Sequence, residues 1–85
     1  MIRGEIVIPG PVGLHARPAA DFVREAEKFT SKVRLAKDGM WANGRSILSI
    51  LTLAAEAGST VVLEVNGADE REAFAALKRK LENAT

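Results

Sequence analysis

The first hydrophobic pattern in the chain alternates with polar residues over residues 2 to 8. One face of this segment carries Ile2, Ile6 and Ile8. The other face carries Arg3 and Glu5. A period of two is typical of a strand with one buried face, and the prolines and glycine of residues 9 to 11 end it.

A helical pattern follows in residues 18 to 29. Apolar side chains recur three or four positions apart, at Ala19, Phe22, Val23, Ala26 and Phe29. The charged residues of this segment fall away from that stripe. The spacing predicts an amphipathic helix of about three turns with one buried side.

Two further apolar runs predict a pair of strands. Residues 33 to 37 alternate again, and residues 40 to 42 return after Asp38 and Gly39. An Asp-Gly pair readily adopts the positive φ angles of a two-residue hairpin turn. We therefore expect these two strands to pair antiparallel.

The second half of the chain predicts helix, strand and helix. The hydroxyl of Ser46 can cap a short helix over residues 46 to 55, and Gly58 marks its end. Residues 60 to 65 form a strand whose inward side chains are Val61, Leu63 and Val65. After a turn at Asn66-Gly67, the last helix follows.

Asp69 and Glu72 stand three residues apart, which is the spacing of a capping box at the start of that last helix. The helix turns four apolar side chains inward, namely Ala73, Phe74, Leu77 and Leu81. The whole order is βαββαβα. It predicts an α+β fold, an open-faced sandwich in which three helices cover one face of a four-stranded antiparallel sheet.

Length and composition restrict the organisation and the class of function. The 85 residues, 47% of them hydrophobic, fit a single domain over residues 1–85. Twelve basic against eleven acidic residues give a net charge of +1, which argues against a nucleic-acid binder. The absence of cysteine suits the cytoplasm, and no apolar run approaches membrane-spanning length, so we expect a soluble protein without membrane insertion.

The only histidine, His15, is the main candidate for chemistry. It stands where the first strand gives way to the helical pattern, so the backbone N–H groups of Ala16 and Arg17 lack helical partners. Those groups and the positive end of the helix dipole suit an anion such as phosphate, and the Arg17 guanidinium adds a forked donor. The competing interpretation is a partly exposed histidine that only caps the helix.

A metal site or another cofactor is not expected. With one histidine and no cysteine, carboxylates would have to supply the remaining metal ligands. The nearest acids in sequence, Glu5 and Asp21, are not at a recognised ligand spacing from His15. A serine hydrolase is also unsupported, since no Gly-x-Ser-x-Gly motif is present.

The segment Gly13-Leu14-His15-Ala16-Arg17-Pro18-Ala19 resembles the phosphoacceptor motif of the HPr family, the histidine phosphocarriers of the bacterial phosphotransferase system. Two further segments resemble that family, namely Asn43-Gly44-Arg45-Ser46-Ile47-Leu48 and Asn66-Gly67-Ala68-Asp69-Glu70. The resemblance extends across the chain. The predicted order of elements is also the family's order.

The resemblance implies a specific role for His15. Enzyme I, charged by phosphoenolpyruvate, would phosphorylate it on Nδ1, and the phosphoryl group would pass to an enzyme IIA in sugar uptake. Arg17 would steady the phosphate. The protein would be a monomeric carrier that is consumed and regenerated, and not a catalyst with turnover.

The predicted second helix is unusually apolar, with Ile47, Leu48, Ile50, Leu51 and Leu53 within seven residues. Such a helix is too apolar for a single buried side, so part of it should be exposed. Periodicity alone leaves central core and docking surface equally open. The resemblance favours docking, with contacts to enzyme I and enzyme IIA from Ala20, Ile47, Leu48 and Leu51 and a basic rim at Arg24 and Arg45.

Ser46 aligns with the serine that HPr kinase/phosphorylase modifies in many Gram-positive members of the family. Its other interpretation is an ordinary N-cap, which we favour, because position 49 is Ser where kinase-regulated relatives commonly have Gly.

Two other functions remain as alternatives. The nitrogen-related branch of the family uses the same histidine motif to feed a regulatory enzyme IIA, and Ser49 with residues 51 to 55 keeps that branch open. An RNA-binding α+β module is more distant. The predicted strands lack the aromatic side chains that stack bases, apart from Trp41.

Overall fold

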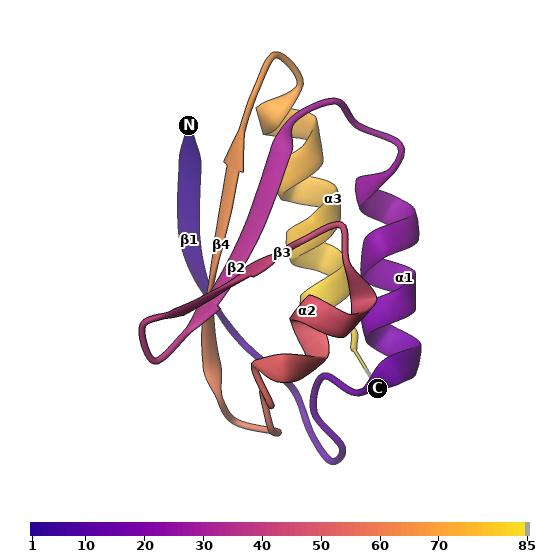
Figure 1. Cartoon of the computed structure of the whole chain (residues 1–85), viewed down its shortest axis with the longest axis vertical. Coiled ribbons are helices and arrows are strands. Elements are labelled where there is room, and N and C mark those ends of the chain that lie inside the picture. Colours follow the sequence, from indigo (N-terminus) through magenta and orange to yellow (C-terminus); the bar gives the residue numbers. More distant parts are fainter. Residues whose placement is uncertain (85) are drawn as a thin grey trace.

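The computed structural model describes residues 1–84 and contains seven elements in the predicted βαββαβα order (Figure 1). The strands are β1 (Ile2–Val7), β2 (Lys32–Lys37), β3 (Met40–Asn43) and β4 (Thr60–Asn66). The helices are α1 (Ala16–Ala26), α2 (Ile47–Thr52) and α3 (Glu70–Glu82). The α+β prediction is therefore confirmed.

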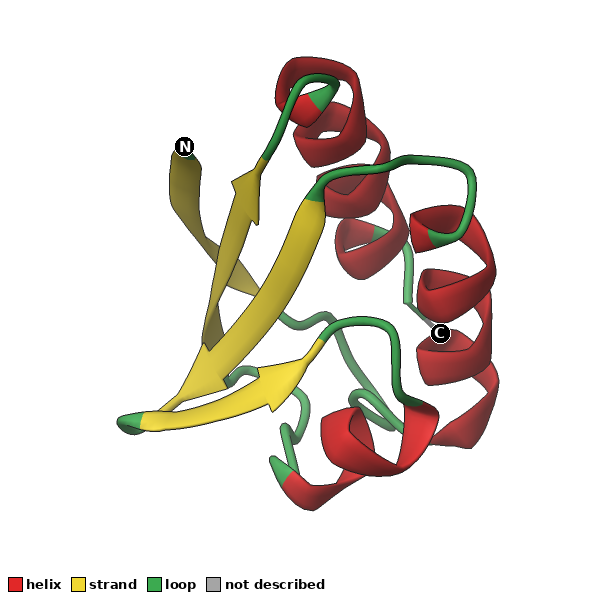
Figure 2. Ribbon diagram, turned by 45° about the horizontal axis from the view of Figure 1, so that its top comes forward, coloured by secondary structure: helices red, strands yellow, loops and turns green. Residues whose placement is uncertain are grey.

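The four strands form one sheet in the order β1-β4-β2-β3, and every pairing is antiparallel. Figure 2 shows the three helices on one side of this sheet, with the other side uncovered. The register places Leu63 of β4 opposite Leu35 of β2 and Val61 opposite Ile6 of β1. Because side chains alternate along a strand, these residues share the face that the helices cover.

The core lies between that face and the helices. Phe22 of α1, Ile50 of α2 and Leu77 of α3 are completely buried, as are Leu35 and Leu63 of the sheet. Phe74 is packed against the core but stays partly exposed, so its predicted inward position is only partly reached. No helix within residues 1–84 has the length and apolar character needed to cross a bilayer.

The predicted hairpin turn between β2 and β3 is confirmed. Asp38 has φ of 51° and Gly39 has φ of 82°, and Lys37 pairs with Met40 across the turn. Two successive positive φ angles are what a two-residue hairpin turn requires, and Gly39 adopts its angle without the steric cost of a Cβ.

The predicted end of the second helix is wrong. α2 stops at Thr52, and Ala54 adopts the left-handed conformation with φ of 51° immediately beyond its C-cap, Leu53. Gly58 also has a positive φ, but it lies in the following turn and donates its N–H to Ile8 O. The sequence rule points to glycine because alanine pays a steric cost in this conformation.

The predicted capping box at the start of α3 is also wrong. Asp69 is the N-cap, yet its side chain makes no capping hydrogen bond. Its carboxylate accepts from the Ser31 hydroxyl, from Thr30 N at 2.8 Å and from Ser31 N at 3.0 Å. These hydrogen bonds, first of all the one from the Ser31 hydroxyl, lower the pKa of the Asp69 carboxyl. Asp69 therefore ties α3 to the connection between α1 and β2.

Candidate functional site

His15 is the N-cap residue of α1, at the position that the sequence predicts. Its backbone is extended, its carbonyl accepts the first helical hydrogen bond from Ala19 N at 3.0 Å, and its N–H donates to Gly13 O. Pro18 lies in the first helical turn, where a missing N–H leaves no partner unsatisfied. The side chain of His15 is thus fixed at the positive end of the helix.

The loop before His15 is held against the segment that follows α2. Leu14 N donates to Ala55 O at 2.8 Å. Gly13 has φ of 82°, and a Cβ placed there would lie 2.7 Å from the same carbonyl oxygen. Only glycine fits this close approach, and it allows the chain to turn directly into α1. Figure 1 shows the two loops side by side below α2.

The imidazole of His15 is half-buried and makes no capping hydrogen bond, so His15 caps α1 through its backbone and not through its side chain. Its Nε2 atom is buried and has no hydrogen-bond partner within residues 1–84. The burial of Nε2 favours the other ring nitrogen, Nδ1, as the atom that meets an incoming group. A buried unpaired nitrogen is costly, and such costs concentrate at functional sites.

Donors for an anion surround the start of α1. Within residues 1–84, the backbone N–H groups of Ala16 and Arg17 have no hydrogen-bond acceptor, and the exposed Arg17 side chain forms no ion pair. Arg17 also lines a hollow of about 220 Å³ together with Lys80 of α3. No local pattern predicts Lys80 beside Arg17, because its only signal in the sequence is a basic run at the end of a helix.

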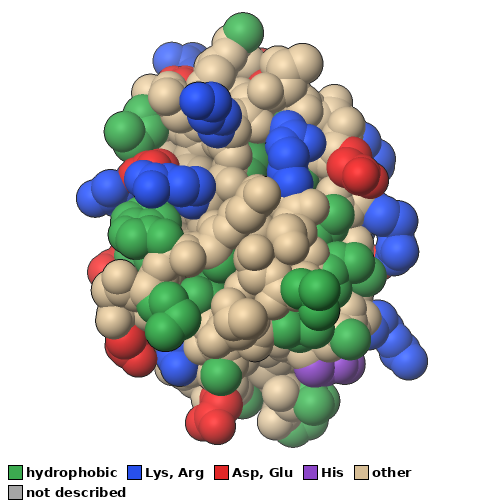
Figure 3. All heavy atoms as spheres, viewed as in Figure 1, with side chains coloured by type: hydrophobic (Ala, Val, Ile, Leu, Met, Phe, Trp, Pro, Cys, Tyr) green, Lys and Arg blue, Asp and Glu red, His purple; other side chains and the backbone are tan. Residues whose placement is uncertain are grey.

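Four apolar residues of α1 and α2 are exposed or half-buried, and we name them the α2 surface: Ala20, Ile47, Leu48 and Leu51. Leu48 is 76% exposed and Ile47 is 38% exposed. Ile50 of the same helix is fully buried, so core and surface interpretations each hold for different residues of α2. Figure 3 shows the purple histidine next to green hydrophobic side chains near the lower end of the molecule.

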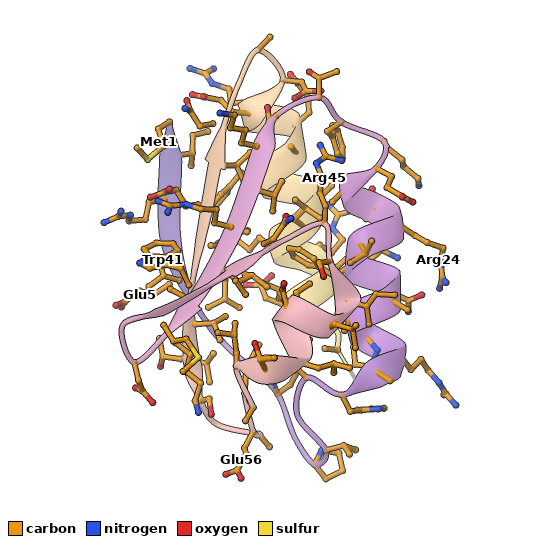
Figure 4. All side chains as sticks on the ribbon, in the orientation of Figure 1. Met1, Glu5, Arg24, Trp41, Arg45 and Glu56 are labelled. Atoms are coloured by element: carbon orange, nitrogen blue, oxygen red, sulfur yellow. The ribbon has the colours of Figure 1, made fainter. Side chains whose placement is uncertain are left out.

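The two arginines expected at a basic rim, Arg24 and Arg45, have different partners in the structure. Arg24 is an exposed residue of α1 that pairs with Asp21, and Figure 4 shows it pointing away from the helix into solvent. Arg45 donates from Nη2 to Phe29 O at 2.7 Å and to Ser31 O at 2.8 Å. Its guanidinium thus closes the connection between α1 and β2, which gives Arg45 a structural role.

Ser46 is the N-cap of α2, and its Oγ accepts from Ser49 N at 3.2 Å. The predicted cap is confirmed.

Within residues 1–84 no group of three or more His, Asp or Glu side chains is arranged to hold a metal ion. The site is therefore built from an imidazole, backbone N–H groups and cations, which is a set of groups suited to a phosphate.

Comparisons with known proteins agree with this geometry. The family model described as "PTS HPr component phosphorylation site" matches residues 2–83. The chain is 44% identical to the HPr-like protein Crh of Halalkalibacterium halodurans over 91% of this chain and 92% of that protein. It is 42% identical to the phosphocarrier protein HPr of Buchnera aphidicola over 87% of each chain.

Solved structures give the same result for the fold. HPr of Thermoanaerobacter tengcongensis superposes with a TM-score of 0.91 at 43% identity, covering 96% of this chain and 92% of that one. Crh of Bacillus subtilis, whose crystal structure is that of a domain-swapped dimer, gives a TM-score of 0.77 at 42% identity, over 95% and 93% of the two chains. The chain therefore belongs to the HPr family of phosphocarrier proteins of the phosphotransferase system.

Proposed function

We propose that this protein accepts a phosphoryl group from enzyme I, charged by phosphoenolpyruvate, on Nδ1 of His15 and passes it to an enzyme IIA. The observation that carries this proposal is the His15 imidazole itself. Its Nε2 is buried and unpaired within residues 1–84, while the ring stands at the N-terminus of α1. Nδ1 is then the nitrogen that meets the donor.

The transfer step needs only the groups at the start of α1. The Nδ1 lone pair of His15 attacks phosphorus, and the bond from phosphorus to the donor breaks as the new bond forms. The added negative charge lies near the N–H groups of Ala16 and Arg17 and within reach of the Arg17 guanidinium. The same step in reverse direction delivers the group to the acceptor, so His15 returns unmodified.

The α2 surface is the proposed docking surface for both partners. Ile47 and Leu48 are exposed and Leu51 and Ala20 are half-buried, and Figure 3 shows the histidine next to hydrophobic side chains. Exposed apolar areas of this kind are typical of protein contact sites. Arg24 is the proposed basic residue at the rim of this docking surface, whereas Arg45 stabilises the fold.

The direct test is incubation with phosphoenolpyruvate and enzyme I, followed by a search for acid-labile phosphohistidine. The wild type should carry one such group and the His15→Ala variant none. A thermal melt of the variant checks that it is folded. Absence of label in the wild type, or label that persists in the folded variant, contradicts the proposal.

A second candidate function is regulation by HPr kinase/phosphorylase, since Ser46 aligns with the serine modified in many members of the family. In that role Ser46 is the modified residue, and its exposed neighbour Leu48 lies on the surface that an added phosphate would alter. Incubation with HPr kinase/phosphorylase and ATP, followed by mass spectrometry, tests it. Phosphoserine at position 46 supports regulation, whereas its absence leaves Ser46 as a helix cap only.

The branch of the family decides which enzyme IIA receives the phosphoryl group. Sugar uptake is our first proposal, and the nitrogen-related branch is its alternative. Transfer from the phosphorylated protein to a sugar-specific and to a regulatory enzyme IIA, measured side by side, separates them. The faster acceptor identifies the branch.

We also propose that the protein acts as a monomer in the cytoplasm, where both partners would have access to His15. The dimer of Bacillus subtilis Crh is the alternative assembly. Light scattering of the purified chain distinguishes a mass near 9.1 kDa from twice that value.

A further inference from the structure

The open face of the sheet carries a hollow that the phosphocarrier function does not use. Its volume is about 660 Å³. Its lining comes from the N-terminus, β2, β3, β4 and the second residue after β3: Met1, Lys32, Val33, Arg34, Trp41, Ala42, Asn43, Arg45, Glu64 and Asn66. Figure 4 shows Met1 and Trp41 on the strand side of the molecule, far from α1.

The hollow is basic. Three cations line it, Lys32, Arg34 and Arg45, against one carboxylate, Glu64. That carboxylate is already neutralised: Arg3 Nη2 lies 2.6 Å from its Oε2, and Arg34 Nε lies 2.9 Å from its Oε1. Within residues 1–84 Lys32 has no acidic partner. An anion that enters the hollow therefore meets a net positive charge.

The hollow also offers a flat aromatic surface. Trp41 is the only tryptophan of the chain and is 40% exposed. The Arg34 guanidinium lies 4.2 Å from the ring centroid, and that of Arg3 lies 5.6 Å from it. Both arginines are paired with Glu64, and their guanidinium groups lie over the ring. The part of the indole that remains exposed is suited to stacking against a planar ligand.

Strand register places these groups in a row. Trp41 is opposite Ala36, Arg34 is opposite Asn43, and Lys32 is opposite Asn66. Since residues 32, 34 and 36 point to the same face of β2, the ring, the guanidinium and the ammonium follow one another. Four residues of strand separate the level of the ring from Lys32, which is roughly 13 Å.

We propose that this hollow binds a purine nucleoside diphosphate, with the base stacked on Trp41 and the phosphates held by Arg34 and Lys32. A free phosphate is too short to span the row. A nucleic acid is disfavoured, because Trp41 is the sole aromatic side chain among the lining residues and the whole chain carries a net charge of only +1.

The test is a titration with ADP at constant ionic strength. Since Trp41 is the only tryptophan, all of the indole fluorescence reports on this hollow. We expect quenching, together with amide shifts in residues 32 to 34, 41 to 43 and 64 to 66. Adenosine alone and pyrophosphate alone should each bind about tenfold more weakly or worse. Absence of shifts in these segments at millimolar ADP, or equal binding of pyrophosphate, overturns the proposal.

Two variants and one matched control locate the ligand. Trp41→Leu and Lys32→Gln should each weaken ADP binding about tenfold, measured by amide shifts because the first variant lacks the fluorophore. Lys78→Gln removes one exposed cation from α3, on the other layer, and should leave binding unchanged. All three should accept phosphate on His15 as the wild type does. Wild-type ADP affinity in both hollow variants, with melts showing them folded, contradicts the assignment.

Discussion

Two polar regions of this molecule differ in whether their charged and polar groups have hydrogen-bond partners. At the start of α1, the His15 ring has a buried Nε2 without a partner, and the nearby N–H groups of Ala16 and Arg17 are unpaired within residues 1–84. On the open face of the sheet, Glu64 is 6% exposed and both of its oxygens are held by arginines. The first region leaves its donors free, whereas the second pairs its carboxylate completely.

The difference separates a site whose donors are left unpaired from a cluster whose carboxylate is paired within the fold. Unpaired donors cost stability in the free protein but can be satisfied by an incoming phosphate. A fully paired carboxylate adds rigidity, because both of its oxygens already have donors within the fold. The helix α2 shows a similar division within its six residues. Ile50 is buried in the core, whereas Leu48 is exposed. Substitutions of buried residues should therefore change stability, whereas substitutions of exposed residues of α2 should change the rate of phosphoryl transfer.

The largest effect on stability should come from Ile50→Ala. Ile50 is fully buried between the sheet and α1, and removal of its side chain leaves a cavity. We expect the free energy of unfolding to fall by about 2–5 kcal/mol. Denaturant unfolding measures it. Phosphoryl transfer per folded molecule should change little, and an equally large loss of transfer rate in the folded fraction would show that the two regions of α2 are not separable.

Leu48→Glu should change stability little and slow phosphoryl transfer strongly, which is the opposite of the pattern expected for Ile50→Ala. Leu48 is 76% exposed, so a charge there should alter stability by no more than about 0.5 kcal/mol. In the centre of a docking surface it should slow transfer from enzyme I about 30-fold. Transfer kinetics and a thermal melt are read on the same sample. A large drop in melting temperature at an unchanged rate would place Leu48 in the fold and not in a contact with partners.

Ala54→Gly should stabilise the protein. Ala54 has φ of 51°, a conformation that costs an L-residue about 1–2 kcal/mol and costs glycine almost nothing. Glycine also makes the unfolded chain more flexible, which offsets about 0.4–1 kcal/mol, so a net gain of about 0.5–1 kcal/mol is expected. Ala57→Gly is the matched control, because this exposed residue has no positive φ, and it should lower stability slightly. A loss of stability in both variants contradicts the strain at Ala54.

The smallest effect should be a change in acid sensitivity. Hydrogen bonds from Arg3 and Arg34 lower the pKa of the Glu64 carboxyl. A carboxyl with a lowered folded pKa stabilises the fold at pH values above its ordinary pKa of 4.5, and this contribution is lost as the pH falls further. Melting temperatures between pH 5 and about pH 3 should fall less steeply for Glu64→Gln than for the wild type.

The acid response of Glu64→Gln should not vanish, because the pKa values of Asp69 and Glu70 are also lowered. Glu5→Gln is the control on the same strand as Arg3, since Glu5 forms no ion pair within residues 1–84. Its profile should match the wild type. Identical profiles for all three proteins would remove Glu64 as a source of pH dependence.

Sequence patterns predicted those features of the fold that depend on neighbours in the chain. The alternation of isoleucines in β1 and the Asp38-Gly39 turn are local properties, and both are confirmed. Asp69 was misassigned because its partners, Thr30 and Ser31, are 39 and 38 positions away. The end of α2 was misassigned because Ala54 adopts a left-handed conformation that its residue type disfavours.

The candidate site shows the same division. The place of His15 at the start of α1 followed from the change of hydrophobic period at that point in the chain. The burial of Nε2 did not, because it depends on how the ring packs in three dimensions. Lys80 and Arg17 line one hollow although 62 residues separate them, and Arg45 is occupied by carbonyl groups of another connection. No local pattern carries such contacts.

The most direct test of the account is to determine which imidazole nitrogen carries the phosphoryl group. The protein, labelled with ¹⁵N at His15, is phosphorylated with phosphoenolpyruvate and enzyme I, and the ring nitrogens are assigned by two-bond and three-bond ¹H–¹⁵N correlations. Because Nε2 is the buried nitrogen, the phosphorus should be bonded to Nδ1. A phosphoryl group on Nε2, or no phosphohistidine at all, would contradict the account.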